Sequence, residues 1–202
     1  MDEGINSYYD NQYMKKYYPG ETTENLPNFI STLSSTDLMA IYHAMAHRKG
    51  LAQPSDLEST AFNFNNYFLS TYQNPAMGFR LLEEYLDTEQ LDQIMQSFFR
   101  EWSFRHPGPE DLQYHFEKNA GKDLGWLFDG ILKNTRVYDY AIRSIERTED
   151  QVHLTIRNKT GYKIPVQLSA FKDNMLIQTE WLEGFSGDTM VTSSLVSADR
   201  FI

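Results

Sequence analysis

The hydrophobic periodicity of the chain changes once, near Tyr138, and this change constrains the fold more than any other feature. Before it, apolar residues recur at three- and four-residue steps, which is the spacing of a helix with one buried face. After it they alternate, which is the spacing of a half-buried strand. Helices followed by strands are typical of α+β proteins. We therefore predict an α+β chain with a helical lobe over residues 1–137 and an antiparallel β module over 138–202.

Cap and turn residues divide the helical lobe. Asn74 is expected to cap a helix that starts at Pro75, because Asn is a good cap and Pro is favoured at the first helical position. Ser55 and Glu58 form a candidate capping box for a short helix. Residues 20–34 read as a loop. The predicted helices cover residues 3–18, 37–49, 75–86, 89–102, 109–121 and 122–133. In the helix over 89–102 the residues expected to point inward are Leu91, Ile94, Met95, Phe98 and Phe99.

The β module is expected to contain short strands separated by turn sequences. The predicted strands cover residues 139–147, 151–158, 163–172, 175–183 and 188–195. Pro165 lies inside the third run, and a proline inside a strand favours an edge position because it cannot donate to the ladder. Several short antiparallel strands of this kind indicate a sandwich or half-barrel.

Composition excludes several classes of function. The formal net charge is −10 and Lys and Arg do not cluster, so the sequence does not predict a nucleic-acid-binding surface. No run of about 18 apolar residues and no signal-peptide pattern occurs in it. Because the sequence has no cysteine, any chemistry must come from carboxylates, His, Tyr and Ser.

His43 and His47 are one helical turn apart, which is the separation that two zinc ligands on a helix require. Position 44 is Ala, so no glutamate lies between them to act as a general base. The next acids, Asp56 and Glu58, lie beyond a predicted break, and no third ligand has a recognisable spacing. A packed or solvated pair is the favoured interpretation, with a metal role as the alternative.

The first helix begins with acidic residues and carries an aromatic pattern. On spacing alone, Glu3 is a carboxylate that the helix dipole favours at a helix start. Ile5 and several tyrosines recur at helical steps, the pattern of a face that packs on a partner. We expect that partner to lie outside this sequence, and we expect the exposed face to promote self-association.

Three features in order give a resemblance to a known family: Asp2-Glu3-Gly4 before an aromatic helix, Tyr67 and Tyr72 before another helix, and a helical lobe that passes into a β module. Together they resemble the gluzincin zinc aminopeptidases, the family of membrane alanyl aminopeptidase and leukotriene hydrolase. That family has a His-Glu-x-x-His helix, then a Trp-Leu-(Asn/Asp)-Glu-Gly segment, whose glutamate Glu3 matches. Later it has a tyrosine, matched by Tyr72, and another five residues earlier, matched by Tyr67. Residues 102–112 and 123–128 also look like bacterial members.

The resemblance implies a parent enzyme that removes N-terminal residues from peptides with zinc-activated water. It assigns Glu3 as the third zinc ligand, Tyr72 as the donor to the oxyanion and Tyr67 as part of the substrate site. Two departures stand against it: no His-Glu-x-x-His occurs in this sequence, and Gln73-Asn74-Pro75 follows Tyr72 where the family has Glu-Lys-Gly. We therefore expect a fragment that is inactive alone and holds no zinc.

An alternative remains open at this stage. The chain would then be a binding or structural module from a degenerate, non-catalytic relative. On that view Tyr72 is a core tyrosine with a backbone partner, Tyr67 is a packing residue, and Glu3 stabilises a helix start.

Overall fold

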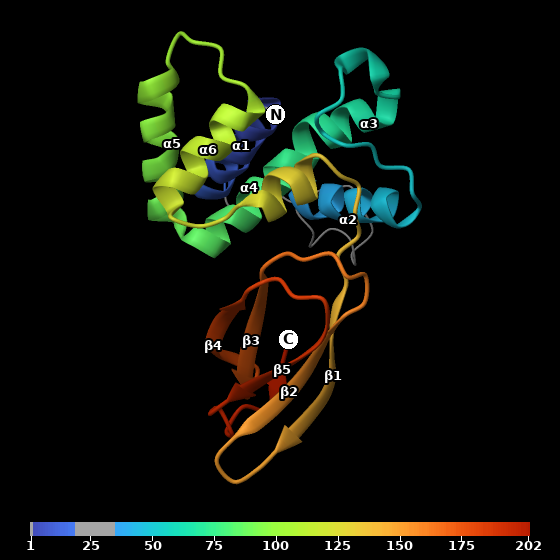
Figure 1. The fold of residues 1–202 in the computed structure, drawn as a ribbon, viewed down its shortest axis with the longest axis vertical. Coiled ribbons are helices and arrows are strands. Elements are labelled where there is room, and N and C mark those ends of the chain that lie inside the picture. Colours follow the sequence, from blue (N-terminus) through green and yellow to red (C-terminus); the bar gives the residue numbers. More distant parts are fainter. Residues whose placement is uncertain (1, 19–34) are drawn as a thin grey trace. The chain divides into compact units, whose positions relative to one another are not determined.

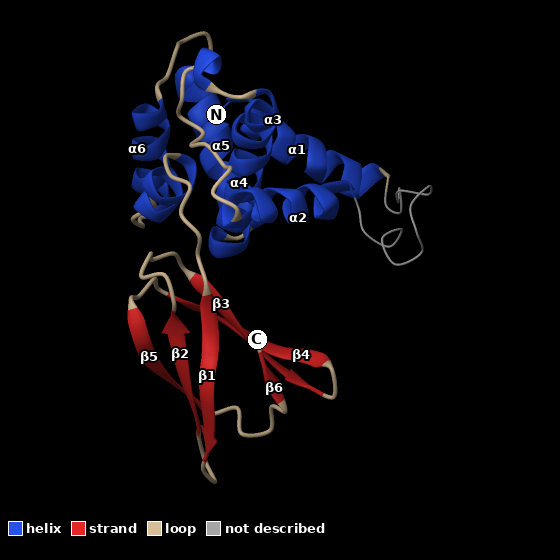
Figure 2. Cartoon of the chain, turned by 90° about the vertical axis from the view of Figure 1, so that its right-hand side faces the viewer, coloured by secondary structure: helices blue, strands red, loops and turns tan. Residues whose placement is uncertain are grey.

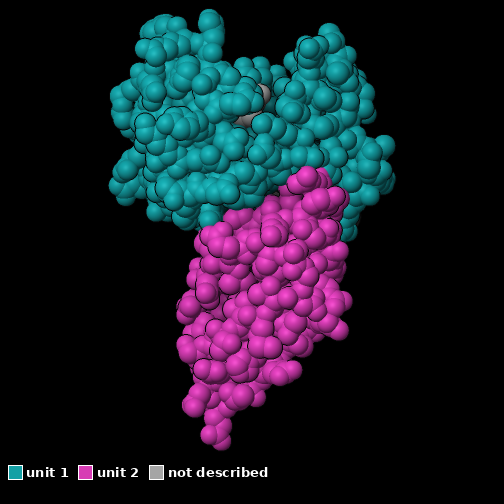
Figure 3. All heavy atoms as spheres, in the orientation of Figure 1, with its two compact units in different colours: residues 1–135 teal, residues 136–202 magenta. Residues whose placement is uncertain are grey.

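The computed structural model describes residues 2–18 and 35–202, apart from the side chains at 35–37 and 39. The chain forms two compact units, residues 1–135 and 136–202 (Figure 3). The first is helical and the second consists of antiparallel strands (Figure 2), so the fold class is α+β as predicted. The loop predicted over 20–34 lies outside the described residues. No helix in the described part of the chain is long and apolar enough to cross a membrane.

The helices of the first unit follow the order shown in Figure 1. Segments η2 and η3 are π-helical, and η1 is a short 3₁₀ turn. The bounds are α1 (Asp2–Tyr17), α2 (Ser35–Arg48), η1 (Ser59–Ala61), α3 (Phe64–Phe68), η2 (Leu69–Gln73), α4 (Asn74–Leu86), α5 (Thr88–Trp102), α6 (Pro109–Ala120) and η3 (Trp126–Leu132).

Glycines end two of these helices, as the sequence indicates. Gly50 and Gly121 have φ angles of 66° and 65°, in the left-handed region that glycine adopts without steric cost. Beyond α2, the N–H of Gly50 donates to the carbonyl of His47 and the N–H of Leu51 to that of Ala46. These bonds satisfy carbonyls that the helix end would otherwise leave unpaired.

The segment from Phe64 to Leu86 is one continuous helix with a π-helical turn in its middle. Asn74 has helical angles (φ −60°, ψ −48°), and its N–H donates to the carbonyl of Leu69, five residues back. The prediction that Asn74 caps a new helix is therefore wrong. Pro75 has no N–H and its ring crowds the preceding turn, and the chain accommodates it by widening into a π turn rather than stopping.

Other predictions from local sequence are also wrong, because tertiary packing overrides the local signals. Ser55 is buried and accepts a hydrogen bond from Asn74 at 2.8 Å, so it makes no capping box with Glu58. The last helix is shorter than predicted, because regular structure begins only around Trp126. In α5, Phe99 is 72% exposed rather than inward, since the buried face follows the steps from Leu91 to Ile94 and on to Phe98.

Aromatic and leucine side chains fill the core of the first unit. The ring centroids of Phe79 and Phe116 are 5.9 Å apart, and those of Phe116 and Phe128 are 6.3 Å apart, both edge to face. The fully buried leucines around them are Leu82, Leu91, Leu124, Leu127 and Leu132. The buried face of α1 consists of Gly4 and Tyr8, whereas Tyr13 and Tyr17 are more than half exposed. The aromatic stripe of α1 thus remains largely uncovered by the described residues.

The second unit contains two three-stranded antiparallel sheets, ordered β1-β2-β5 and β4-β3-β6. The strands are β1 (Tyr140–Arg147), β2 (Val152–Asn158), β3 (Val166–Lys172), β4 (Met175–Leu182), β5 (Gly187–Ser193) and β6 (Arg200–Phe201). One core joins the two sheets, with Leu154 from β2, Leu168 from β3 and Phe201 from β6. This is a sandwich. The sequence missed β6, which has only two residues.

Pro165 does not mark an edge strand. It lies just before β3, which is the central strand of its sheet, so the predicted edge position is wrong. A proline immediately before a strand leaves the hydrogen-bond ladder intact.

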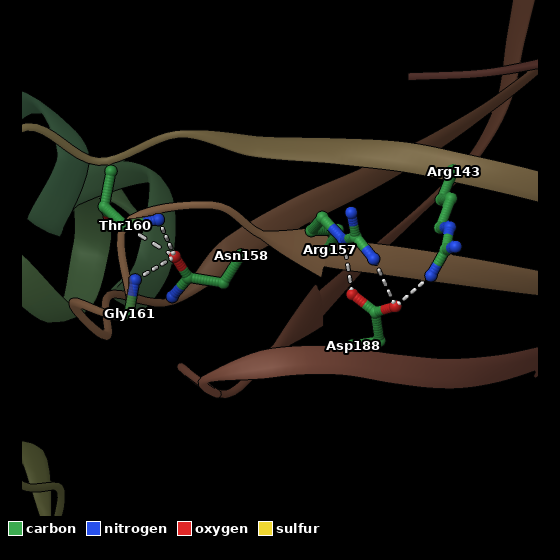
Figure 4. Close-up of polar contacts among 6 residues, drawn as sticks. All are labelled: Arg143, Arg157, Asn158, Thr160, Gly161 and Asp188. Carbon is green, nitrogen blue, oxygen red and sulfur yellow. Dashed lines mark hydrogen bonds and ion pairs between the residues drawn. The ribbon is translucent and has the colours of Figure 1, made fainter.

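Two polar clusters hold the first sheet of this unit (Figure 4). Asp188 accepts two hydrogen bonds from Arg157, at 2.7 and 3.0 Å, and one from Arg143 at 2.6 Å. These two guanidinium groups hold the pKa of Asp188 down at about 2. Arg143 is the extra residue of a bulge in β1, which re-aims its side chain.

Asn158 is buried at the end of β2. Its amide donates to the carbonyls of Tyr162 and Phe185, both at 2.7 Å. Its side-chain oxygen accepts from the N–H groups of Thr160 and Gly161 at 3.0 and 2.9 Å (Figure 4). One side chain thus ties together the turn after β2 and the segment before β5.

Candidate functional site

Gly4 allows α1 to lie directly against the π turn. A Cβ at this position would be 2.2 Å from the Cβ and 2.8 Å from the Cγ of Pro75. These are ring atoms next to the backbone, so they could not move aside as the end of a flexible side chain does. The close approach of α1 to Pro75 places Glu3, the residue before Gly4, on the turn of α1 that neighbours η2.

Glu3 from α1 and Tyr72 from η2 come together at this contact. The pKa of the half-buried Tyr72 phenol is raised by desolvation first, then by the charge of Glu3 and by Tyr67, and a hydrogen bond with Glu3 adds to the effect. At neutral pH the phenol therefore keeps its proton and is a hydrogen-bond donor. The structure brings together two of the three predicted site residues.

Tyr67 is the third, and the π turn brings it to the same region. Its ring centroid is 6.4 Å from that of Tyr72, in an edge-to-face arrangement. Phe68 stacks against Tyr72, with the ring centroids 5.5 Å apart. Because hydrogen bonds in a π turn run five residues back, residues five apart lie nearly above one another. Tyr67 remains 42% exposed, so its ring is accessible to a ligand.

The residues present do not complete a zinc site. The described residues contain no group of three His, Asp or Glu side chains that could hold a metal ion. Glu3 is thus at most a single carboxylate ligand, and the nearby donor, Tyr72, is a protonated phenol. A metal at this position would need ligands from outside the described residues.

Comparison with solved structures finds chains of similar fold. Aminopeptidase A from Legionella pneumophila, crystallised in complex with aspartic acid, matches with a TM-score of 0.66 at 16% sequence identity. The match covers 98% of this chain and 22% of that protein. The chain shares the fold of the matched part of that protein.

Sequence comparisons do not assign the chain to a family. No family model matches the chain, and no curated protein matches it. At 16% identity the structural likeness establishes the fold alone. The roles of Glu3, Tyr67 and Tyr72 stay predictions that rest on the local geometry.

His43 and His47 face each other across one turn of α2. Their Nε2 atoms are 3.1 Å apart and their ring centroids 4.3 Å apart. Burial and the neighbouring His47 lower the pKa of His43 to about 4, and burial lowers the pKa of His47 as well. Both rings are therefore neutral at neutral pH. They do not form a metal-binding group with Glu3.

A Ser-His-Glu arrangement also occurs, which the sequence did not indicate. The Oγ of Ser97 is 2.8 Å from Nε2 of His115, and Nδ1 of His115 is 3.1 Å from the carboxylate of Glu101. Ser97, however, lies in the middle of α5 and its hydroxyl donates to the carbonyl of Ile94. The serine is thus not poised as a nucleophile. The buried His115 instead ties α6 to α5, and its place on the inward face of α6 is the only sequence signal for it.

Proposed function

We propose that this chain is part of a zinc-dependent aminopeptidase of the gluzincin type, which hydrolyses N-terminal residues from peptides. The chain spans 22% of the length of its structural neighbour, which leaves room for a catalytic helix elsewhere in a longer protein. The observation that carries the proposal is the effect of Glu3 on Tyr72: the carboxylate matched to the family's metal ligand is near enough to raise the pKa of the phenol matched to its oxyanion donor.

Each of the three residues has a chemical task in the intact protein. Glu3 would complete a three-ligand site for zinc, an ion that acidifies bound water to a pKa near 7. Tyr72 would donate its hydrogen bond to the oxyanion that forms at the peptide carbonyl. The carboxylate beside it keeps the proton on the phenol, because a phenolate next to Glu3 would place two negative charges together. Tyr67 would border the bound peptide with its accessible ring.

The chain alone is expected to lack peptidase activity and catalytic zinc. Its sequence contains no His-Glu-x-x-His, so two zinc ligands and the general base are missing from it. Oxyanion donors without a nucleophile do not hydrolyse an amide at a useful rate. The parent is therefore an enzyme in this proposal, and the described piece is a part of it that is inactive alone.

A second candidate is a binding or structural module from a degenerate relative. It is favoured by the Gln73-Asn74-Pro75 sequence after Tyr72, where the family has Glu-Lys-Gly. In this case Gly4 is needed for packing on Pro75, and Tyr67 and Tyr72 belong to an aromatic cluster without chemistry.

The gene sequence upstream of Glu3 distinguishes the two candidate functions. A His-Glu-x-x-His encoded shortly before Glu3 supports the peptidase, and its absence supports the module. As a biochemical test, purified residues 1–202 should release no product from an aminoacyl anilide, with or without added zinc. Hydrolysis by this chain that depends on zinc would contradict the proposal.

Self-association through α1 is a separate expectation. Tyr13 and Tyr17 are 55% and 57% exposed, and their ring centroids are 4.7 Å apart. Light scattering should show oligomers at high concentration that a Tyr13→Ser, Tyr17→Ser double variant loses. A strict monomer at all concentrations would count against this surface.

A further inference from the structure

We propose that His43 and His47 form a metal site separate from Glu3, a two-imidazole chelate for a late first-row divalent ion such as Cu²⁺ or Zn²⁺. Their Nε2 atoms lie 3.1 Å apart on adjacent turns of one helix. Neutral imidazole nitrogens are preferred ligands for these ions. The proposal does not depend on the peptidase assignment.

The separation of the two nitrogens matches the bite of a bound metal. Metal–nitrogen bonds of about 2.0–2.1 Å place two ligand atoms about 3.3–3.4 Å apart at a tetrahedral angle and about 2.9 Å apart at a right angle. The observed 3.1 Å lies between these values. Little movement of either ring would be needed to admit an ion.

Hydrogen bonds to the rest of the fold orient both rings. Asn74 donates its amide to Ser55 and to the carbonyl of Ile131, so its side-chain oxygen is left to accept from His43. The backbone of Thr135 accepts a hydrogen bond from His47. Each Nε2 faces the other ring, and two imidazole nitrogens 3.1 Å apart can hold either a shared proton or a metal ion between them.

This arrangement is characteristic of metal-binding histidines. Such residues almost always donate the other ring N–H to a carbonyl, carboxylate or water, which fixes the tautomer. From the sequence alone the absence of a spaced third ligand favoured a packed pair, but the 3.1 Å approach of the two Nε2 atoms points to an ion.

The donor set limits the kind of ion and its affinity. The described residues provide no third His, Asp or Glu beside the pair, so water or a small ligand would fill the remaining positions. Binding should be weaker than at a structural zinc site and should follow the usual order of divalent ions, with Cu²⁺ tightest. A proton shared between the two rings is the competing explanation.

Titration calorimetry of residues 1–202 with Cu²⁺ and with Zn²⁺, after treatment with a chelator, tests the site. We expect one ion of each kind per chain, and a loss of affinity of about tenfold or more in His43→Asn and in His47→Asn. His106→Asn, a change at an exposed histidine in the α5–α6 connection, is the matched control and should bind as the wild type does. Circular dichroism and the melting temperature check that each variant is folded.

A measurement on the unaltered chain covers the case in which a variant does not fold. Electron paramagnetic resonance of the Cu²⁺ complex should show two nitrogen donors. Unchanged affinity in folded His43→Asn and His47→Asn, a spectrum without imidazole nitrogen, or no saturable binding would overturn the proposal, and the last result would leave the pair sharing a proton.

Discussion

The carboxylate of Glu3 interacts with the phenol of Tyr72, although one residue lies in the first turn of α1 and the other in a π turn of a distant helix. After desolvation, the charge of Glu3 is the largest cause of the raised pKa of Tyr72. The contact exists because Gly4 lets α1 close on Pro75.

Glu3→Gln should lower the pKa of Tyr72 towards its ordinary value. Removing the negative charge makes the phenolate less unfavourable, while the desolvation effect remains. NMR titration of labelled tyrosine rings measures the change. Asp10→Asn removes an exposed charge from the same helix and should leave the Tyr72 titration unchanged; an equal effect of both variants would show that the contact is not specific.

Gly4→Ala should destabilise the first unit by about 1–3 kcal/mol, the usual cost of forcing an extra methyl group into a packed contact. The methyl group would lie 2.2 Å from the Cβ of Pro75, so α1 must shift. Urea denaturation measures the loss, and Asn6→Ala on the exposed side of α1 is the control. A stability equal to that of the wild type would mean that α1 is not held against Pro75.

The sequence predicted the fold class and most elements because the local signals agreed with the packing. The change of period near Tyr138 separated helices from strands, and glycines such as Gly50 ended helices where expected. The predicted boundary at 137 lies close to the division between residues 135 and 136. Those features depend on neighbours in sequence, which a single sequence displays.

The sequence could not predict features that depend on distant residues. Asn74 has the sequence pattern of a helix cap, but its side-chain amide instead donates hydrogen bonds to Ser55 and to the carbonyl of Ile131. Glu3 and Tyr72 were identified as site residues by the family resemblance, because their spacing in the sequence does not indicate that they lie near each other. The surroundings of His43 and His47 include Asn74 and Thr135, which are distant in sequence. Hydrophobic periodicity does not indicate that these residues lie near the two histidines.

Acid should destabilise the first unit through His43. The pKa of this ring falls from 6.5 to about 4 on folding, chiefly through burial, so the unfolded chain binds more protons between these values. The free energy of unfolding should therefore fall as the pH falls from about 6.5 to about 4, and this contribution should be fully present above that window.

Urea denaturation across the window, with a chelator present, measures this dependence. His43→Asn should flatten it and His106→Asn should not. Identical pH profiles for wild type and His43→Asn would contradict the assignment.

Asn158→Ala should destabilise the β unit by about 2–4 kcal/mol, because it removes the hydrogen bonds of a buried side chain, each worth about 0.5–1.5 kcal/mol. The affected groups include the carbonyls of Tyr162 and Phe185. Thermal unfolding of the chain measures the effect. Glu149→Gln, in the exposed turn between β1 and β2, should change the stability little, and similar losses in both variants would argue against the network.

The most direct test of the central claim is the rate of aminoacyl anilide hydrolysis by the longest natural polypeptide that contains these residues. We predict that Tyr72→Phe lowers kcat by about 10²- to 10³-fold, as removal of one oxyanion donor typically does. KM should change little, and Tyr114→Phe, at an exposed position in α6, should have no effect. An active enzyme whose kcat is unaffected by Tyr72→Phe would contradict the account.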